Sequence, residues 1–171
     1  VERSGEASNL KVDISKFFDK TYTLEQGYVE GGDILRINNH FIIGISGRTN
    51  ETGAKNLSNI IEKNGGTSEI AITPENTLHF KSECSLLDEE TILATDNLIK
   101  SDFFNKKYRI IKVPKGEETG ANCLRINEHL LIPKGYDRLL DLVSKDYKIR
   151  VLDVTEMEKV DAGLSCLSLR W

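Results

Sequence analysis

The sequence predicts an α/β protein built from repeated modules, each consisting of a β-hairpin, a helix and a third strand. Residues 34–43 (ILRINNHFII) and residues 123–132 (CLRINEHLLI) are near copies of each other. The same order of elements recurs three times, with rounds at Leu35, Leu86 and Leu124, about 40 to 50 residues apart. One module alone cannot bury its apolar face, so such repeats stack on one another. A propeller whose blades are ββαβ modules fits this pattern best, and a plain α+β sandwich is the alternative.

The first module shows the pattern most clearly at its helix. Residues 34–37 and 41–43 are rich in strand-forming side chains and flank a polar turn, which predicts a hairpin. Residues 52–63 carry apolar side chains at a helical period and end at an Asn-Gly-Gly stop signal. Residues 69–73 then predict a short strand, closed by a proline.

The second and third modules repeat this order. Residues 84–87 and 91–94 flank an acidic turn and predict a second hairpin, followed by a short helix or turn and a strand at 108–113. After the third hairpin, residues 135–144 predict a helix and residues 148–154 a strand.

The pattern also predicts that the repeat is incomplete. Residues 165–170 resemble the first strand of a fourth hairpin, so the chain holds about three and a half modules, too few to close a ring. The sequence begins at Val1 and its only methionine is Met157. We therefore expect residues 1–171 to form one partial propeller domain whose N-terminal blades are missing. An incomplete ring exposes edge strands, from which we expect a homo-oligomer or a missing N-terminal half as partner.

Composition excludes several classes of protein. The net charge of −4, without a dense Lys/Arg block, predicts no nucleic-acid partner, and no apolar run reaches the roughly 20 residues that span a membrane. Cys84, Cys123 and Cys166 are an odd number of cysteines at spacings unlike those of a disulfide framework or a zinc site. We therefore expect no metal and a reducing, cytoplasmic location.

A glycine pair flanked by carboxylates is the first candidate site. In Glu30-Gly31-Gly32-Asp33 the glycines permit close approach of a backbone, and two carboxylates stand beside them. A turn that enters a strand is an equally good account of the same residues.

Three further residues carry candidate chemistry. The planar guanidinium group of Arg48 can bind a carboxylate through two hydrogen bonds, although a lone arginine in a loop is usually solvated. His79 stands just before the second hairpin, in the place that Glu30 occupies before the first, and it could act as a general acid or base. Cys166 could act as a nucleophile, although most cysteines are inert core residues. His40 and His129 occupy equivalent positions in the polar turns of the first and third predicted hairpins, and we interpret both as structural residues.

Taken in order, the motifs resemble those of the dimethylarginine dimethylaminohydrolase family, a member of the guanidino-modifying (pentein) superfamily. No single motif is specific, but the ordered set is, and it extends over nearly the whole chain. The matching motifs are Glu30-Gly31-Gly32-Asp33, Ser46-Gly47-Arg48-Thr49-Asn50, Leu78-His79-Phe80-Lys81-Ser82, Ala121-Asn122-Cys123 and Glu158-Lys159-Val160-Asp161 leading to Ser165-Cys166. The resemblance implies a five-bladed propeller of ββαβ modules.

The resemblance also implies a role for each matching residue. Cys166 would be the nucleophile, His79 the general acid/base and Glu30 the carboxylate beside the guanidinium group. Arg48 would pair with the α-carboxylate of a small-molecule substrate, a methylated arginine or arginine. Arg3 resembles, more loosely, a further substrate-binding arginine.

Three more residues are assigned to the substrate site through the same motifs. Val160 would present its backbone carbonyl to the α-amino group, and Asp161 and Asp33 belong to matching motifs beside it and beside Glu30. The implied reaction passes through a covalent thiouronium on Cys166 and needs no cofactor, because the guanidinium carbon is already electrophilic.

Three alternatives stay open: arginine deiminase, a related enzyme that acts on another guanidino compound, and a propeller that only binds. Arginine deiminase shares this chemistry but places an aspartate two residues after its histidine, where this sequence has Lys81. A propeller that only binds, without catalysis, would make the three catalytic types coincidental. The family's early acidic pair, which clamps the guanidinium group, has no match in residues 1–20.

Overall fold

The computed structural model describes residues 6–104 and 107–168, and in this part of the chain nine strands form three sheets. Each sheet belongs to one module and has the predicted order of hairpin, helix and third strand. The first module consists of β1 (Ile34–Ile37), β2 (His40–Ile45), α2 (Glu51–Lys63) and β3 (Thr67–Ile72). The second consists of β4 (Cys84–Leu86), β5 (Thr91–Ala94), α3 (Asp96–Lys100) and β6 (Arg109–Lys112). The third consists of β7 (Leu124–Ile126), β8 (His129–Pro133), α4 (Asp137–Val143) and β9 (Lys148–Leu152). The ββαβ repeat is therefore confirmed.

The three sheets share one topology. The second strand lies in the middle, antiparallel to the first and parallel to the third. The parallel pair requires a crossover, and the helix supplies it. In the first and third hairpins the turn is made by Asn38 (φ 55°) and Asn127 (φ 53°), because asparagine tolerates the left-handed conformation better than most residues.

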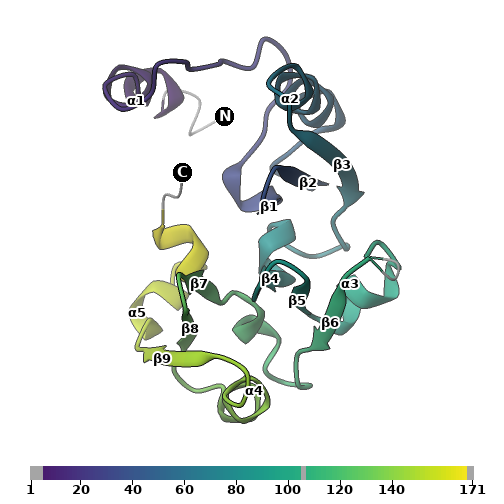
Figure 1. Ribbon diagram of the computed structural model, residues 1–171, viewed down its shortest axis with the longest axis vertical. Helices are drawn as coiled ribbons and strands as arrows, with labels where there is room; N and C mark the ends of the chain where they lie inside the picture. Colours follow the sequence, from purple (N-terminus) through teal and green to yellow (C-terminus); the bar gives the residue numbers. More distant parts are fainter. Residues whose placement is uncertain (1–5, 105–106, 169–171) are drawn as a thin grey trace.

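The modules follow one another along an arc (Figure 1). Strands β1, β4 and β7 lie on the inner side, and β1 contacts β4, which contacts β7. Helices α2, α3 and α4 lie on the outer side of the arc. The helix α1 (Glu6–Ile14) precedes the first module, and α5 (Thr155–Glu158) follows the third.

The apolar core lies between modules as well as within them. One buried cluster joins Leu35 and Ile42 of the first module to Phe80 and Ile92 of the second. Another joins Leu93 of the second module to residues of the third. Each hairpin is thus covered by its neighbour, as the repeat pattern predicts.

A short 3-10 helix leads into every hairpin. These entry turns are η1 (Gly31–Asp33) before β1, η2 (Phe80–Ser82) before β4 and η3 (Glu118–Ala121) before β7. A fourth, η4 (Leu164–Leu167), stands where residues 165–170 were predicted to form a strand, so that prediction is wrong as far as the described residues reach. The physical reason is that the Ser165 N–H donates to a side chain, Asn122, and no neighbouring strand pairs with this segment in the described part of the chain.

None of the helices in the described ranges is both long enough and apolar enough to cross a membrane.

Candidate active site

The entry turns place the candidate catalytic residues at equivalent points of successive modules. Glu30 is the residue before η1, and His79 is the residue before η2. Both have extended backbone conformations there, as the residue that precedes a helical turn commonly has. Cys166 lies within η4, the entry turn that follows the third module. The correspondence of Glu30 and His79 that the sequence predicted is therefore confirmed.

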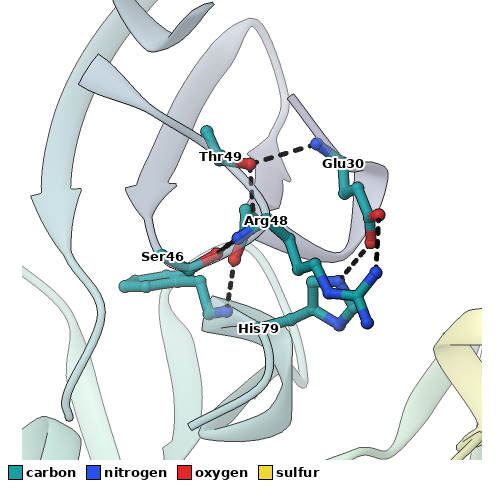
Figure 2. A network of polar contacts seen from close by, with 7 residues as sticks. Glu30, Ser46, Arg48, Thr49 and His79 are labelled. Atoms are coloured by element: carbon teal, nitrogen blue, oxygen red, sulfur yellow. Dashed lines mark hydrogen bonds and ion pairs between the residues drawn. The ribbon is translucent and has the colours of Figure 1, made fainter. Parts of the chain in front are cut away.

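Glu30, His79 and Arg48 converge on one another (Figure 2). The Nε2 atom of His79 lies 2.7 Å from one carboxylate oxygen of Glu30, and Nη1 of Arg48 lies 3.5 Å from the other. The His79 side chain is mostly buried, whereas half of the Arg48 side chain is exposed to solvent. A histidine oriented by a carboxylate is suited to proton transfer, and an exposed guanidinium group beside it is suited to an anionic ligand.

Asp33 holds the three loops that carry these residues. Its carboxylate is fully buried and accepts hydrogen bonds from the Ser46 hydroxyl (2.7 Å), the Thr49 hydroxyl (2.7 Å) and the Phe80 backbone N–H (2.8 Å). The Thr49 hydroxyl in turn accepts from the Glu30 N–H at 3.1 Å. The prediction that Asp33 contacts substrate is therefore wrong in this structure, because the chain itself surrounds the carboxylate.

Gly32 provides the space in which the His79 ring lies. A Cβ atom added at Gly32 would stand 2.5 Å from Cγ and 2.8 Å from Nδ1 of that ring, closer than real Cβ contacts come. A Cβ atom at the adjacent Gly31 would meet nothing within 4 Å. Only the second glycine of the pair is therefore required for the histidine to reach Glu30.

The C-terminal candidates lie on a separate segment. Val160 and Asp161 form the turn after α5, both exposed, with Asp161 in the left-handed region at φ 56°. The Cys166 side chain is exposed as well. Within the described residues no hydrogen bond joins its thiol to His79, so the two groups are not paired in this structure. Arg3 lies outside the described residues.

The other two cysteines are unlike Cys166. Cys84 and Cys123 are buried, and burial raises the pKa of both thiols, that of Cys123 to about 12. A buried thiol with a raised pKa is inert as a nucleophile, so the structure leaves Cys166 as the accessible thiol among the described residues. These same residues contain no group of three or more His, Cys, Asp or Glu side chains placed to hold a metal ion.

Three residues of the site have roles that the sequence did not assign. Thr49 links Asp33 to Glu30, Gly32 accommodates His79, and Asn122 accepts a hydrogen bond from Ser165 beside Cys166. All three stand inside motifs that the sequence analysis had singled out. Their position in those motifs was the available signal, but their partners lie far away in the chain.

Comparison with known proteins agrees with the motifs. The profile of the arginine deiminase family matches residues 10–131. A dimethylarginine dimethylaminohydrolase from Pseudomonas aeruginosa is 34% identical over 172 residues, which cover 99% of this chain and 67% of that protein. One from Streptomyces coelicolor is 30% identical over 151 residues, which cover 85% of this chain and 55% of that protein. The chain thus spans about two thirds of the first relative and about half of the second.

A solved structure shows the same fold. The dimethylarginine dimethylaminohydrolase of Pseudomonas aeruginosa, in a variant complexed with citrulline, matches this structure with a TM-score of 0.92 and 33% sequence identity. The match covers 99% of this chain and 67% of that one. The chain therefore belongs to the guanidino-modifying (pentein) superfamily, in the family that contains arginine deiminase and dimethylarginine dimethylaminohydrolase.

Proposed function

We propose that the protein carrying this chain hydrolyses the guanidinium C–N bond of an Nω-methylated arginine and releases citrulline and dimethylamine. The observation that carries the proposal is the 2.7 Å hydrogen bond between His79 and Glu30, two residues 49 positions apart that belong to successive modules. Its support from relatives is the Pseudomonas aeruginosa enzyme, which is named for this reaction and is known in complex with citrulline.

The proposed mechanism uses the chain's own groups. The Cys166 thiolate forms a bond to the guanidinium carbon, and the bond from that carbon to the dimethylamino nitrogen breaks as His79 donates a proton to the departing amine. The covalent thiouronium is then attacked by a water molecule that has given its proton to His79. The C–S bond breaks, the new hydroxyl group gives up its proton through solvent to the released dimethylamine, citrulline leaves, and the thiolate and the protonated His79 are restored. Glu30 orients His79 and stabilises positive charge beside it.

Substrate recognition is proposed for three parts of the chain. Arg48 would pair with the α-carboxylate, since its guanidinium group is half exposed and lies beside Glu30. The exposed turn of Val160 and Asp161 would receive the α-amino group through the Val160 carbonyl. Arg3 stays a proposed further contact.

The larger assembly also belongs to this proposal. We propose that the three modules and η4 are part of a five-bladed propeller of which residues 1–171 form one partial domain, and that modules outside this chain complete the substrate site. The first two relatives, which extend beyond the match, support this arrangement. Cytoplasmic location and homo-oligomer formation stay predictions.

Arginine deiminase is the second candidate function, because the matching family profile carries that name. The two reactions share the citrulline product and differ in the leaving group, ammonia or dimethylamine. Lys81, two residues after His79, stands where the deiminase pattern has an aspartate that grips an unsubstituted guanidinium group, which favours the methylated substrate.

The test is citrulline formation from asymmetric dimethylarginine and from arginine, by the whole gene product, by the 171-residue chain and by a Cys166→Ser variant. We expect turnover of the methylated substrate by the gene product and none by the variant. Turnover of arginine alone would assign the protein to the deiminases. An inactive gene product with both substrates would contradict the proposed reaction and favour a binding module.

A further inference from the structure

The turn that carries Cys166 is held by a single side chain of the third entry turn. Asn122, the residue that ends η3, is about nine-tenths buried, and its Oδ1 accepts a hydrogen bond from the Ser165 N–H at 2.9 Å. Ser165 immediately precedes Cys166. The Cys166 N–H donates to the Gly163 carbonyl at 3.0 Å and closes the turn around the same point.

Gly163 shows how closely this turn approaches Asn122. A Cβ atom added at Gly163 would stand 2.6 Å from Cγ and 2.7 Å from Nδ2 of the Asn122 side chain. The Asn122 amide therefore packs closely against the backbone of residue 163 while it accepts from residue 165. Two independent contacts, one steric and one polar, thus join the same amide to the segment that carries Cys166.

Asn122 is itself fixed from the second module. The buried Ser85 hydroxyl of β4 lies within hydrogen-bond distance of the carbonyls of Ala121 and Cys123, and it accepts from the Cys123 N–H at 2.9 Å. The residues on both sides of Asn122 are therefore attached to one strand. Ser85 thus holds the backbone on either side of Asn122, and the Asn122 side chain in turn holds Ser165, next to Cys166.

The Cys166 turn is also held by apolar packing at Leu164. Leu164 is buried in a cluster with Leu124 and Val154. Apolar contacts hold the turn against the core but do not set its orientation, because they are not directional. The hydrogen bond from Ser165 to Asn122 supplies the direction.

We propose that Asn122 is the positioning residue for the nucleophile, setting the direction in which the Cys166 thiolate approaches the guanidinium carbon. This inference rests on the proposed function, in which Cys166 attacks. Asn122 touches neither the substrate nor the thiol in this role and acts only through the backbone of residues 163–165. The sequence motif Ala121-Asn122-Cys123 thereby acquires a function that its spacing did not reveal.

The experiment compares Asn122→Ala with Asn122→Asp in the whole gene product. Asn122→Asp keeps an acceptor oxygen at the same place, and Asn122→Ala removes it. Asn97→Ala, the same change at an exposed position of α3, is the matched control. For Asn122→Ala we expect kcat to fall about 10- to 100-fold with KM changed less than about threefold, because attack geometry is lost while binding contacts remain. Asn122→Asp should recover most of kcat, and the recovery should grow as the pH is raised, because the added negative charge disfavours the thiolate.

A second readout does not depend on turnover. Cys166 is alkylated with 2-chloroacetamidine, whose amidinium group resembles a guanidinium, and with neutral iodoacetamide, and the two rates are read from the Cys166 peptide by mass spectrometry. The alkylation ratio is the rate with 2-chloroacetamidine divided by the rate with iodoacetamide. We expect this ratio to fall about tenfold in Asn122→Ala and to be retained in Asn122→Asp and Asn97→Ala. A fallen ratio in a protein without citrulline formation would uphold the positioning role and overturn the proposed reaction.

Gly163→Ala is the second variant, because it displaces the Asn122 amide without removing it. It should lower both kcat and the alkylation ratio, as Asn122→Ala does. If Asn122→Ala does not fold, Gly163→Ala provides the test of the proposal. Wild-type kcat and an unchanged ratio in a folded Asn122→Ala or Gly163→Ala protein would overturn the proposal. So would equal losses in Asn122→Ala and Asn122→Asp.

Discussion

At the scale of single residues, Asp33 illustrates how a buried charge can organise a site without facing it. Burial of a carboxylate is costly unless hydrogen bonds compensate, and here the hydroxyls of Ser46 and Thr49 and the N–H of Phe80 do so. These donors belong to the loops that carry Arg48 and His79. The cost of burying the charge is therefore offset by contacts that set the distances between the candidate catalytic groups.

The first prediction concerns stability. Asp33→Ala leaves buried donors unpaired, so we expect the free energy of unfolding to fall by about 3 to 5 kcal/mol, measured by urea denaturation. Asp33→Asn retains one acceptor and should cost less. Asp141→Ala, an exposed aspartate of α4, is the control and should stay within about 0.5 kcal/mol of wild type. A loss below about 1 kcal/mol in Asp33→Ala would contradict the role given to this carboxylate.

The second prediction separates the two glycines of one motif. Gly32→Ala should push the His79 ring away from Glu30 and lower kcat roughly 100-fold, because a displacement of about 1 Å at a catalytic group has an effect of that size. Gly31→Ala should keep near wild-type kcat, since its methyl group meets open space. Citrulline formation is measured for both variants, together with their melting temperatures. Equal losses in the two variants would show that the ring does not depend on Gly32.

The sequence predicted that the motif at residues 30–33 belongs to the site, but not that its residues have different roles. Glu30, Gly32 and Asp33 are near neighbours in the chain, yet Glu30 pairs with His79, Gly32 leaves space for its ring and Asp33 holds the surrounding loops. Ser46 and Thr49 meet Asp33 when the first module folds, whereas His79 and Phe80 become neighbours of this motif only after the first two modules pack together. A one-dimensional pattern does not contain those distances.

At the scale of elements, the same side-chain hydrogen bond supports the turns of the first and third hairpins. The Nε of Arg36 donates to the Asn38 carbonyl at 2.8 Å, and the Nε of Arg125 donates to the Asn127 carbonyl at 3.0 Å. Both asparagines have positive φ. The repeated Leu-Arg-Ile-Asn sequence thus encodes the strand, the turn and the side-chain bond that supports the turn, which is why these hairpins could be predicted locally.

The junction of the first two modules contains a histidine whose pKa is lowered. Burial of His40, and next the charge of Lys107, hold the pKa of its imidazole below its usual value. The ring lies 2.8 Å from the Thr67 hydroxyl, and Lys107 also contacts Glu69 at 2.7 Å. The prediction that His40 is structural agrees with these contacts.

The third prediction follows from that shift. Because the folded state binds the His40 proton less readily than the unfolded state, stability is retained above the unfolded pKa of about 6.5 and falls as the pH is lowered from there towards the folded pKa. Denaturation curves at several pH values should show an excess slope of at most about 1.4 kcal/mol per pH unit that disappears in His40→Gln. His129→Gln, the same change in the third module, should leave the contribution of His40 in place. An unchanged slope in His40→Gln would refute the assignment.

At the scale of the whole molecule, the two buried cysteines mark the two junctions between modules. Cys84 lies in the cluster shared by the first and second modules, and Cys123 in the cluster shared by the second and third. Module two contributes to both, so opening one junction weakens the other. We infer that the described modules unfold together as one cooperative unit.

The fourth prediction tests that cooperativity by thiol labelling. In native buffer near pH 8, Cys166 should react at least about a thousandfold faster than Cys84 and Cys123, because burial protects these two and raises their pKa values. With increasing urea, Cys84 and Cys123 should become reactive over the same range of concentration. Peptide mass spectrometry distinguishes the three sites. Exposure of Cys123 well before Cys84 would show that the third module opens by itself.

Within the three modules, the order and type of the hairpins, crossover segments and third strands were determined by the sequence itself, since the hairpin turns, the helical periods and the repeat spacing depend on residues close together in the chain. The ordered motifs were also sufficient to predict the family. Tertiary structure alone decided that Asp33 serves the scaffold and that residues 164–167 form an entry turn held by Asn122. It also decided that Gly32 accommodates His79. The physical reason is distance along the chain. Hairpins and helices satisfy their hydrogen bonds locally, whereas the contacts of Asp33 with Phe80, of Gly32 with His79 and of Asn122 with Ser165 join residues about 40 to 50 positions apart. The first two of these form only when the first two modules bury their shared core.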